Sequence, residues 1–108
     1  MDMTEATRQG LVPRHADGCH LDAEAEPALL TRTTGAPAWS EPARTTLVLN
    51  DTALALWELC DGQTSVQEMV DAVCALFVGP PERLRADVLD ALDRLTDSGM
   101  LVWSVRLG

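Results

Sequence analysis

Residues 50–99 read NDTALALWELCDGQTSVQEMVDAVCALFVGPPERLRADVLDALDRLTDSG, and this stretch carries the clearest helix signals in the chain. Asn50 is a favourable helix N-cap, and the apolar residues after it recur at the spacing of one helix face up to the Asp-Gly pair at 61–62. Ser65 and Glu68 have the spacing of a capping box, which begins a second amphipathic helix. The first part of the stretch therefore predicts two helices joined by a short turn.

A third helix is predicted after the Gly-Pro-Pro run at 79–81. Proline is tolerated in the first turn of a helix but not in its interior, so this run ends the second helix and begins the third. Gly99 is placed to cap the end of the third helix. The apolar face of this helix recurs every three or four residues and consists of Leu84, Val88, Leu92 and Leu95, widened by Leu89 and Ala91.

The residues before Asn50 carry the signals of short strands and turns. Alternating or β-branched residues predict strands at 19–23, 28–33 and 45–49, with a wide Pro-rich loop at 34–42. We expect an α+β fold of the winged helix-turn-helix type, in which a small three-stranded antiparallel sheet precedes three helices. The strand at 45–49 has only one sequential neighbour to pair with, so we expect it to form an edge of that sheet.

The two ends of the chain give weaker signals. Residues 1–12 are polar and aperiodic, so we expect a frayed tail followed by one domain at 13–108. Residues 101–107 alternate apolar and polar side chains, which predicts a short strand or an extended end.

Charge and hydropathy exclude several classes of function. The 108 residues include 17 acidic and 8 basic side chains, all of the latter arginine, for a formal net charge of −9. Such a charge opposes binding to nucleic acid, and no apolar run is long enough to span a membrane. With no basic, apolar signal segment at the amino terminus and an odd number of cysteines, the sequence predicts a soluble cytoplasmic protein with reduced thiols.

No catalytic or metal-binding motif stands out. His15, Cys19 and His20 are the only set that suggests a metal site, and their irregular spacing in a turn-rich segment favours an incidental grouping. Cys60 and Cys74 occupy apolar helix faces, where a buried small side chain is the usual explanation. We therefore expect no enzymatic activity, no metal and no cofactor.

Several segments resemble the PqqD family. They are the Leu-Asn-Asp-Thr-Ala start at 49–53, the Asp-Gly-Gln-Thr-Ser-Val turn at 61–66, the Asp-Val pair at 87–88 and the Gly-Met-Leu ending at 99–101. The resemblance extends over roughly 13–103 and departs from the family pattern in its long, Pro-rich loop before Arg44.

The resemblance implies a recognition element for ribosomally synthesised, post-translationally modified peptides (RiPPs). Such a protein binds the leader segment of a precursor peptide and presents it to a modifying enzyme, of the radical-SAM type or a leader peptidase. The resemblance thus implies a peptide chaperone without chemistry of its own, and a homodimer is compatible with it. The alternatives are a winged-helix transcriptional regulator, which the acidic helices disfavour, and a subunit that only stabilises an enzyme.

The peptide site expected from this resemblance combines the edge strand with the third helix. An extended leader can add to the strand through main-chain hydrogen bonds. The expected strand residues are Thr45, Thr46, Leu47, Val48 and Leu49. The expected helix residues are Leu84, Arg85, Val88, Leu89 and Leu92. Leu84, Val88 and Leu92 also fit a core role, so Arg85 and Leu89 are the better candidates for direct contact.

The tryptophans and the acidic face of the third helix each allow more than one interpretation. Trp57 and Trp103 fit the core, whereas Trp39 stands in the Pro-flanked loop and is either an exposed contact or a lid over the core. Asp90 shares a polar helix face with Asp93 and Asp97, which favours a solvated surface over docking to an Arg-rich partner.

Overall fold

The computed structural model describes residues 10–35, 39–41 and 43–105 of the chain. In chain order, the elements are β1 Leu11–His15, β2 Cys19–Asp22, β3 Ala28–Thr34, β4 Ala43–Leu49, α2 Asp51–Leu59, α3 Val66–Leu76, α4 Pro81–Asp97 and β5 Leu101–Val105. The expected α+β class, with a small antiparallel sheet followed by three helices, is confirmed.

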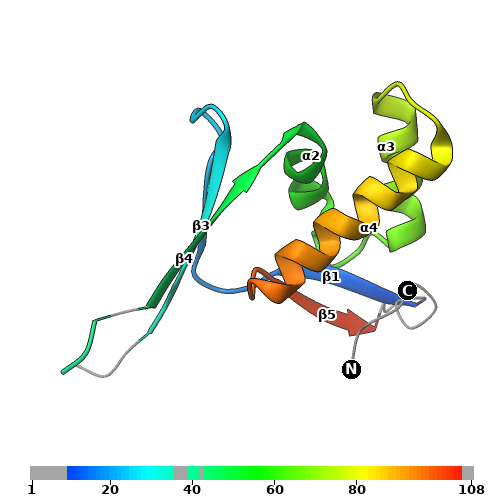
Figure 1. Ribbon diagram of the computed structural model, residues 1–108. Helices are drawn as coiled ribbons and strands as arrows, with labels where there is room; N and C mark the ends of the chain where they lie inside the picture. Colours follow the sequence, from blue (N-terminus) through cyan, green and yellow to red (C-terminus); the bar gives the residue numbers. More distant parts are fainter. Residues whose placement is uncertain (1–9, 36–38, 42, 106–108) are drawn as a thin grey trace.

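The three-stranded sheet has the order β2-β3-β4, and both pairs are antiparallel. All three expected strands form, and β4 begins two residues before the predicted start at Thr45. Gly18 opens the sheet with a φ of +84°, a left-handed conformation that favours glycine. The hairpin of β3 and β4 extends far beyond the helices as a wing (Figure 1).

A second, two-stranded sheet pairs β1 with β5 and is not expected from the sequence. Leu11 and Val12 had been placed in the tail, yet both belong to β1, and Val12 is only 1% exposed. The backbone N–H of Ala16 donates to the carbonyl of Met100, and this bond fixes which residues of β1 point to β5. By the alternation of an antiparallel pair, the backbone nitrogen of Pro13 points away from β5, so its missing N–H does not weaken the pair. The rest of the expected tail, residues 1–9, lies outside the described residues.

The helix ends follow the predicted signals. The side chain of Asn50 accepts the N–H of Ala53 at 2.8 Å and caps α2. Ser65 and Glu68 cap α3 reciprocally, as the capping box predicts. Gly99 follows the last turn of α4 with a φ of +76°, which lets the chain reverse into β5.

One core joins the helices to the inner end of the sheet. Leu30 of β3 and Leu49 of β4 pack with buried residues of all three helices, among them Leu56, Met69 and Leu92. The outer part of β4, from Ala43 to Thr46, is exposed and adds nothing to this core. Within the described residues, none of the helices is long and apolar enough to cross a membrane.

Candidate functional site

The free edge of β4 is the first component of the candidate site. Among the residues that the structure describes, β4 pairs only with β3, so it is an edge strand as the sequence predicts. An edge strand presents main-chain N–H and C=O groups that another extended segment can pair with.

The direction of each N–H along β4 follows from one hydrogen bond in the neighbouring hairpin. The backbone N–H of Thr33 donates to the carbonyl of Gly18 at 3.0 Å. In antiparallel pairing, alternate residues bond to one neighbour and then to the other. The register extends this alternation to β4, so the main-chain groups of Leu47 point to β3 and those of Thr46 and Val48 point to the open edge.

The side chains of β4 alternate in the complementary sense. Leu47 and Leu49 lie on the core face, opposite the buried Leu30 and Ala28 of β3. Val48 lies on the other face and is 51% exposed. The open edge therefore offers main-chain groups at residues whose side chains contribute little to the core.

The apolar residues expected on the third helix belong mainly to the core. Leu84, Val88 and Leu92 are all buried, with exposed fractions between 0% and 7%. They hold α4 against the other helices and are not accessible to a peptide on the surface.

Arg85 and Leu89 lie on one flank of α4, next to α3. The Arg85 guanidinium donates from Nη1 to Oε1 of Gln67 in α3, at 3.3 Å. Leu89 follows one turn later on the same flank and is half-buried against the core. The structure thus brings these two residues toward α3 rather than toward the start of α2.

The opposite flank of α4 borders a hollow of about 280 Å³, which we call the edge hollow. It begins where β4 ends, at Asn50, and Thr52 of α2 lines the same side. Its α4 side contains Ala91 and four charged residues that we call the charged flank, namely Arg83, Asp87, Asp90 and Arg94. These four residues follow at intervals of four, three and four, so one flank carries them all.

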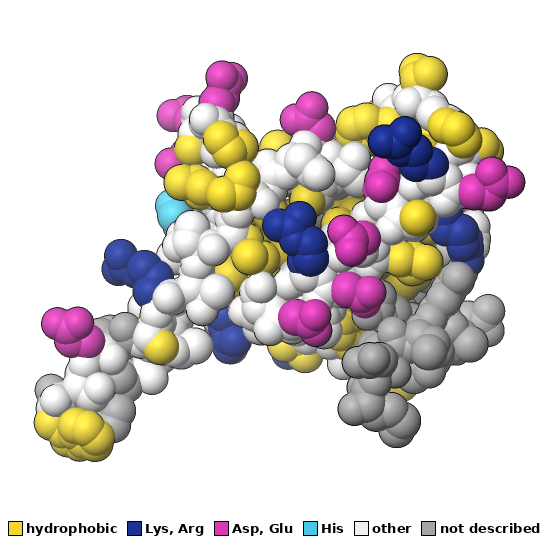
Figure 2. Space-filling model, viewed as in Figure 1, with side chains coloured by type: hydrophobic (Ala, Val, Ile, Leu, Met, Phe, Trp, Pro, Cys, Tyr) yellow, Lys and Arg dark blue, Asp and Glu magenta, His cyan; other side chains and the backbone are white. Residues whose placement is uncertain are grey.

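The charged flank is not among the residues expected from the sequence. Its spacing is visible in the sequence, but a helix has two flanks beside its apolar stripe, and only the packing shows which one borders the strand edge. Figure 2 shows acidic and basic side chains interspersed along the exposed side of α4.

The family model described as "Coenzyme PQQ synthesis protein D (PqqD)" matches residues 40–101, more than half of the chain. The chain belongs to the PqqD family. The match includes β4 and the three helices, and it starts later than the expected resemblance, so β1, β2 and β3 lie before it. No curated protein and no solved structure matches the chain significantly.

Membership of the PqqD family indicates an accessory protein of RiPP-related biosynthesis. The segment that the family model matches contains the open edge of β4, all of α4 and every residue that lines the edge hollow. The candidate site is therefore formed entirely within the PqqD-like part of the chain.

The three cysteines of this PqqD domain are free thiols. Cys60 is 1% exposed, and burial raises the pKa of its thiol to about 12. A thiol with this pKa is almost entirely protonated at neutral pH and therefore unreactive. This agrees with the expected role of Cys60 as a buried small side chain, while Cys74 is half-buried.

The histidines and Cys19 do not come together as ligands. The imidazole of His15 stacks on the ring of Trp57, with ring centroids 3.6 Å apart. His20 and Cys19 are consecutive in β2 and so point to opposite faces of the sheet. Across the described parts of the chain, no cluster of three or more His, Cys, Asp or Glu side chains could hold a metal ion.

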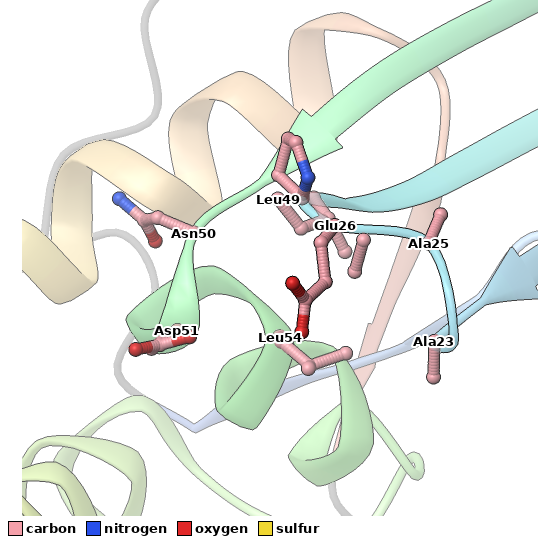
Figure 3. Close-up of a pocket in the computed structure, with 9 residues that line it drawn as sticks. Ala23, Ala25, Glu26, Leu49, Asn50, Asp51 and Leu54 are labelled. Atoms are coloured by element: carbon pink, nitrogen blue, oxygen red, sulfur yellow. The ribbon is translucent and has the colours of Figure 1, made fainter.

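A second hollow, of about 420 Å³, lies between the β2–β3 turn and the start of α2. It shares Asn50 with the edge hollow, and Leu49 and Leu54 provide apolar contacts. Glu26 projects into it toward Leu54 (Figure 3). With Asp51 also at its border, this hollow is acidic and separate from the charged flank of α4.

The tryptophans separate into core and surface residues. Trp57 is buried, and the indole N–H of Trp103 donates to Oγ1 of Thr96 at 3.0 Å. Trp39 is 86% exposed in the loop at the end of the wing, which excludes its role as a lid over the core.

Proposed function

We propose that this protein binds the leader segment of a RiPP precursor as an added strand on β4 and presents it to a modifying enzyme. The enzyme is of the radical-SAM type or a leader peptidase, and the protein itself contributes no catalysis. The single observation that carries the proposal is the open edge of β4, with the main-chain groups of Thr46 and Val48 directed away from β3.

Strand addition supplies affinity through main-chain hydrogen bonds and leaves selectivity to side-chain contacts. Thr45, Leu47 and Leu49 keep the strand on the sheet through their bonds to β3. The buried residues Leu84, Val88 and Leu92 hold α4 in a fixed position beside it. A leader bound to this edge would thus meet a rigid framework.

Contacts from α4 come, in this proposal, from the flank that borders the edge hollow. Arg85 and Leu89 remain candidates for a contact with a longer leader or with the enzyme, because their side chains are still partly exposed at the border with α3. A cytoplasmic location suits this function, since ribosomally made precursors arise there and the three cysteines are free thiols.

The test is a calorimetric titration with a synthetic candidate leader, taken from a short open reading frame found next to the gene of this protein. Val48→Pro removes an N–H that points to the open edge, so it should abolish binding while the protein stays folded. Val105→Pro is the matched control, because the register of β5 directs the N–H of Val105 away from β1. It should bind the leader like the unmodified protein.

Leu47→Pro completes the test. It removes an N–H that bonds to β3, so it should lower the stability of the wing, as circular dichroism during urea unfolding would show. Full affinity in a folded Val48→Pro variant would contradict strand addition at β4.

A further inference from the structure

The charges of the charged flank follow a basic-acidic-acidic-basic order along α4, and a peptide lying beside the helix would pass them one after another. Arg83 comes first, Asp87 and Asp90 lie in the middle, and Arg94 comes last. All four side chains are exposed or nearly so, and no ion pair joins any of them to another residue in the described part of the chain. Their charges are thus available to a ligand in the edge hollow.

Helix and strand geometry relate this order to positions in a peptide. With a rise of about 1.5 Å per residue, Arg83 and Arg94 are each about 8 Å along the helix from the point midway between Asp87 and Asp90. An extended peptide covers about 6.6 Å in two residues. Residues two apart also point to the same side of a strand, so three alternate side chains can face the charged flank together.

β4 and α4 are inclined in a similar direction (Figure 1). A peptide paired with the open edge of β4 can continue past the end of the strand toward α4, because Asn50, which directly follows β4, lines the same hollow as the charged flank. At Asn50 it would reach the edge hollow.

We propose that the charged flank selects a peptide with the pattern acidic-x-basic-x-acidic. The central Lys or Arg meets Asp87 and Asp90, and the acidic residues two positions away on either side meet Arg83 and Arg94. This proposal rests on the proposed function, because it assumes a peptide on the edge of β4, and it adds the chemistry of the residues that this protein accepts.

The two flanks of α4 provide an internal contrast. Arg85 lies on the α3 side and is already bonded to Gln67, so its charge does not contribute to the selection. Glu82 and Asp97 are exposed on α4 and do not line the edge hollow. They therefore serve as controls for the effect of charge alone.

The experiment is a selection from a displayed peptide library on the purified protein. Three alternate positions of an extended peptide vary among Glu, Lys and Ala, and the rest of the peptide is fixed from the synthetic leader. We expect the Glu-x-Lys-x-Glu peptides to be enriched about tenfold over the Lys-x-Glu-x-Lys peptides at low salt. A single exposed ion pair contributes little, but the several pairs that differ between these two peptides together give this ratio.

The double variant Asp87→Asn and Asp90→Asn should lose the preference for the central basic residue. The double variant Glu82→Gln and Asp97→Asn removes the same charge and should keep the preference. Raising the salt concentration should weaken the preference, because these pairs are exposed.

The Val48→Pro variant separates the two proposals. Peptides that bind the protein but not Val48→Pro, without any preference among the three positions, would overturn the charge selection and leave strand addition intact. Peptides that bind both proteins equally would contradict strand addition itself. A preference that persists in the Asp87→Asn and Asp90→Asn variant would show that other residues select the charge.

Discussion

α4 and β4 border the same candidate site but differ in what their side chains do. α4 buries five residues in the core, whereas the first four residues of β4 are all exposed. Stability therefore depends on the helices and on the inner end of the sheet. The outer part of β4 contributes a main-chain edge, whose binding capacity depends on direction and pairing rather than on side-chain packing.

The difference between α4 and β4 predicts that the largest loss of stability follows a substitution at Leu92. Leu92→Ala should lower the free energy of unfolding by about 2–5 kcal/mol, because the side chain is fully buried and its removal leaves a cavity. Val48→Ala, in the exposed part of the edge strand, should change it by no more than about 0.5 kcal/mol. Urea unfolding of both variants measures the difference, and equal losses would contradict the division between the two elements.

A smaller effect is expected where the wing depends on its backbone. Gly18→Ala should cost about 1–3 kcal/mol, since φ is +84° and the added Cβ would lie 2.4 Å from the carbonyl oxygen of Thr33. Gly35→Ala is the control, because no atom lies within 4 Å of the Cβ it would add. Thermal unfolding of the two variants should show a lower Tm only for the first.

The capping box of α3 should contribute less. Ser65→Ala removes the hydroxyl that accepts the N–H of Glu68 at 3.1 Å, and it should cost about 1 kcal/mol. Ser104→Ala, at an exposed position of β5, should have almost no effect. A loss at Ser65 as large as that at Leu92 would mean that local capping, rather than core packing, limits the stability of the helices.

The smallest effect is a pH dependence at the turn between α2 and α3. The N–H of Gln63 donates to the carboxylate of Asp61 at 2.8 Å, and together with bonds from Thr64 it lowers the pKa of Asp61. A lowered pKa in the folded state stabilises the protein above the unfolded-state pKa, and this stability is lost as the pH falls through the folded-state pKa. Asp61→Asn should therefore lose less stability than the unmodified protein between about pH 5 and pH 3, the range in which carboxyl groups titrate. Urea unfolding of both proteins at several pH values in this range measures the difference.

Much of the fold could be predicted because its signals are local. Asn50, Ser65 and Pro81 mark the start of the three helices through capping preferences and proline geometry, which need no information about distant residues. The pairing of β2, β3 and β4 was equally accessible, because each of these strands pairs with its neighbour in the sequence. β1 was missed because Pro13 interrupts its apolar pattern and its partner β5 lies at the other end of the chain.

The candidate site could be predicted only in part, and for a related reason. The edge position of β4 follows from the order of strands, but the direction of the N–H of Val48 depends on a register fixed by Gly18 and Thr33. Likewise, the periodicity of α4 shows its apolar stripe, while the choice between the flank of Arg85 and the flank of Asp87 depends on how three helices pack.

Amide hydrogen exchange of β4, measured by NMR with and without the synthetic leader, tests strand addition most directly. In the free protein, the N–H groups of Thr46 and Val48 should exchange fast and that of Leu47 slowly, because only the last bonds to β3. The leader should slow exchange at Thr46 and Val48 and leave Leu47 unchanged. A bound leader that slows exchange along β5, and not at Thr46 or Val48, would contradict the account.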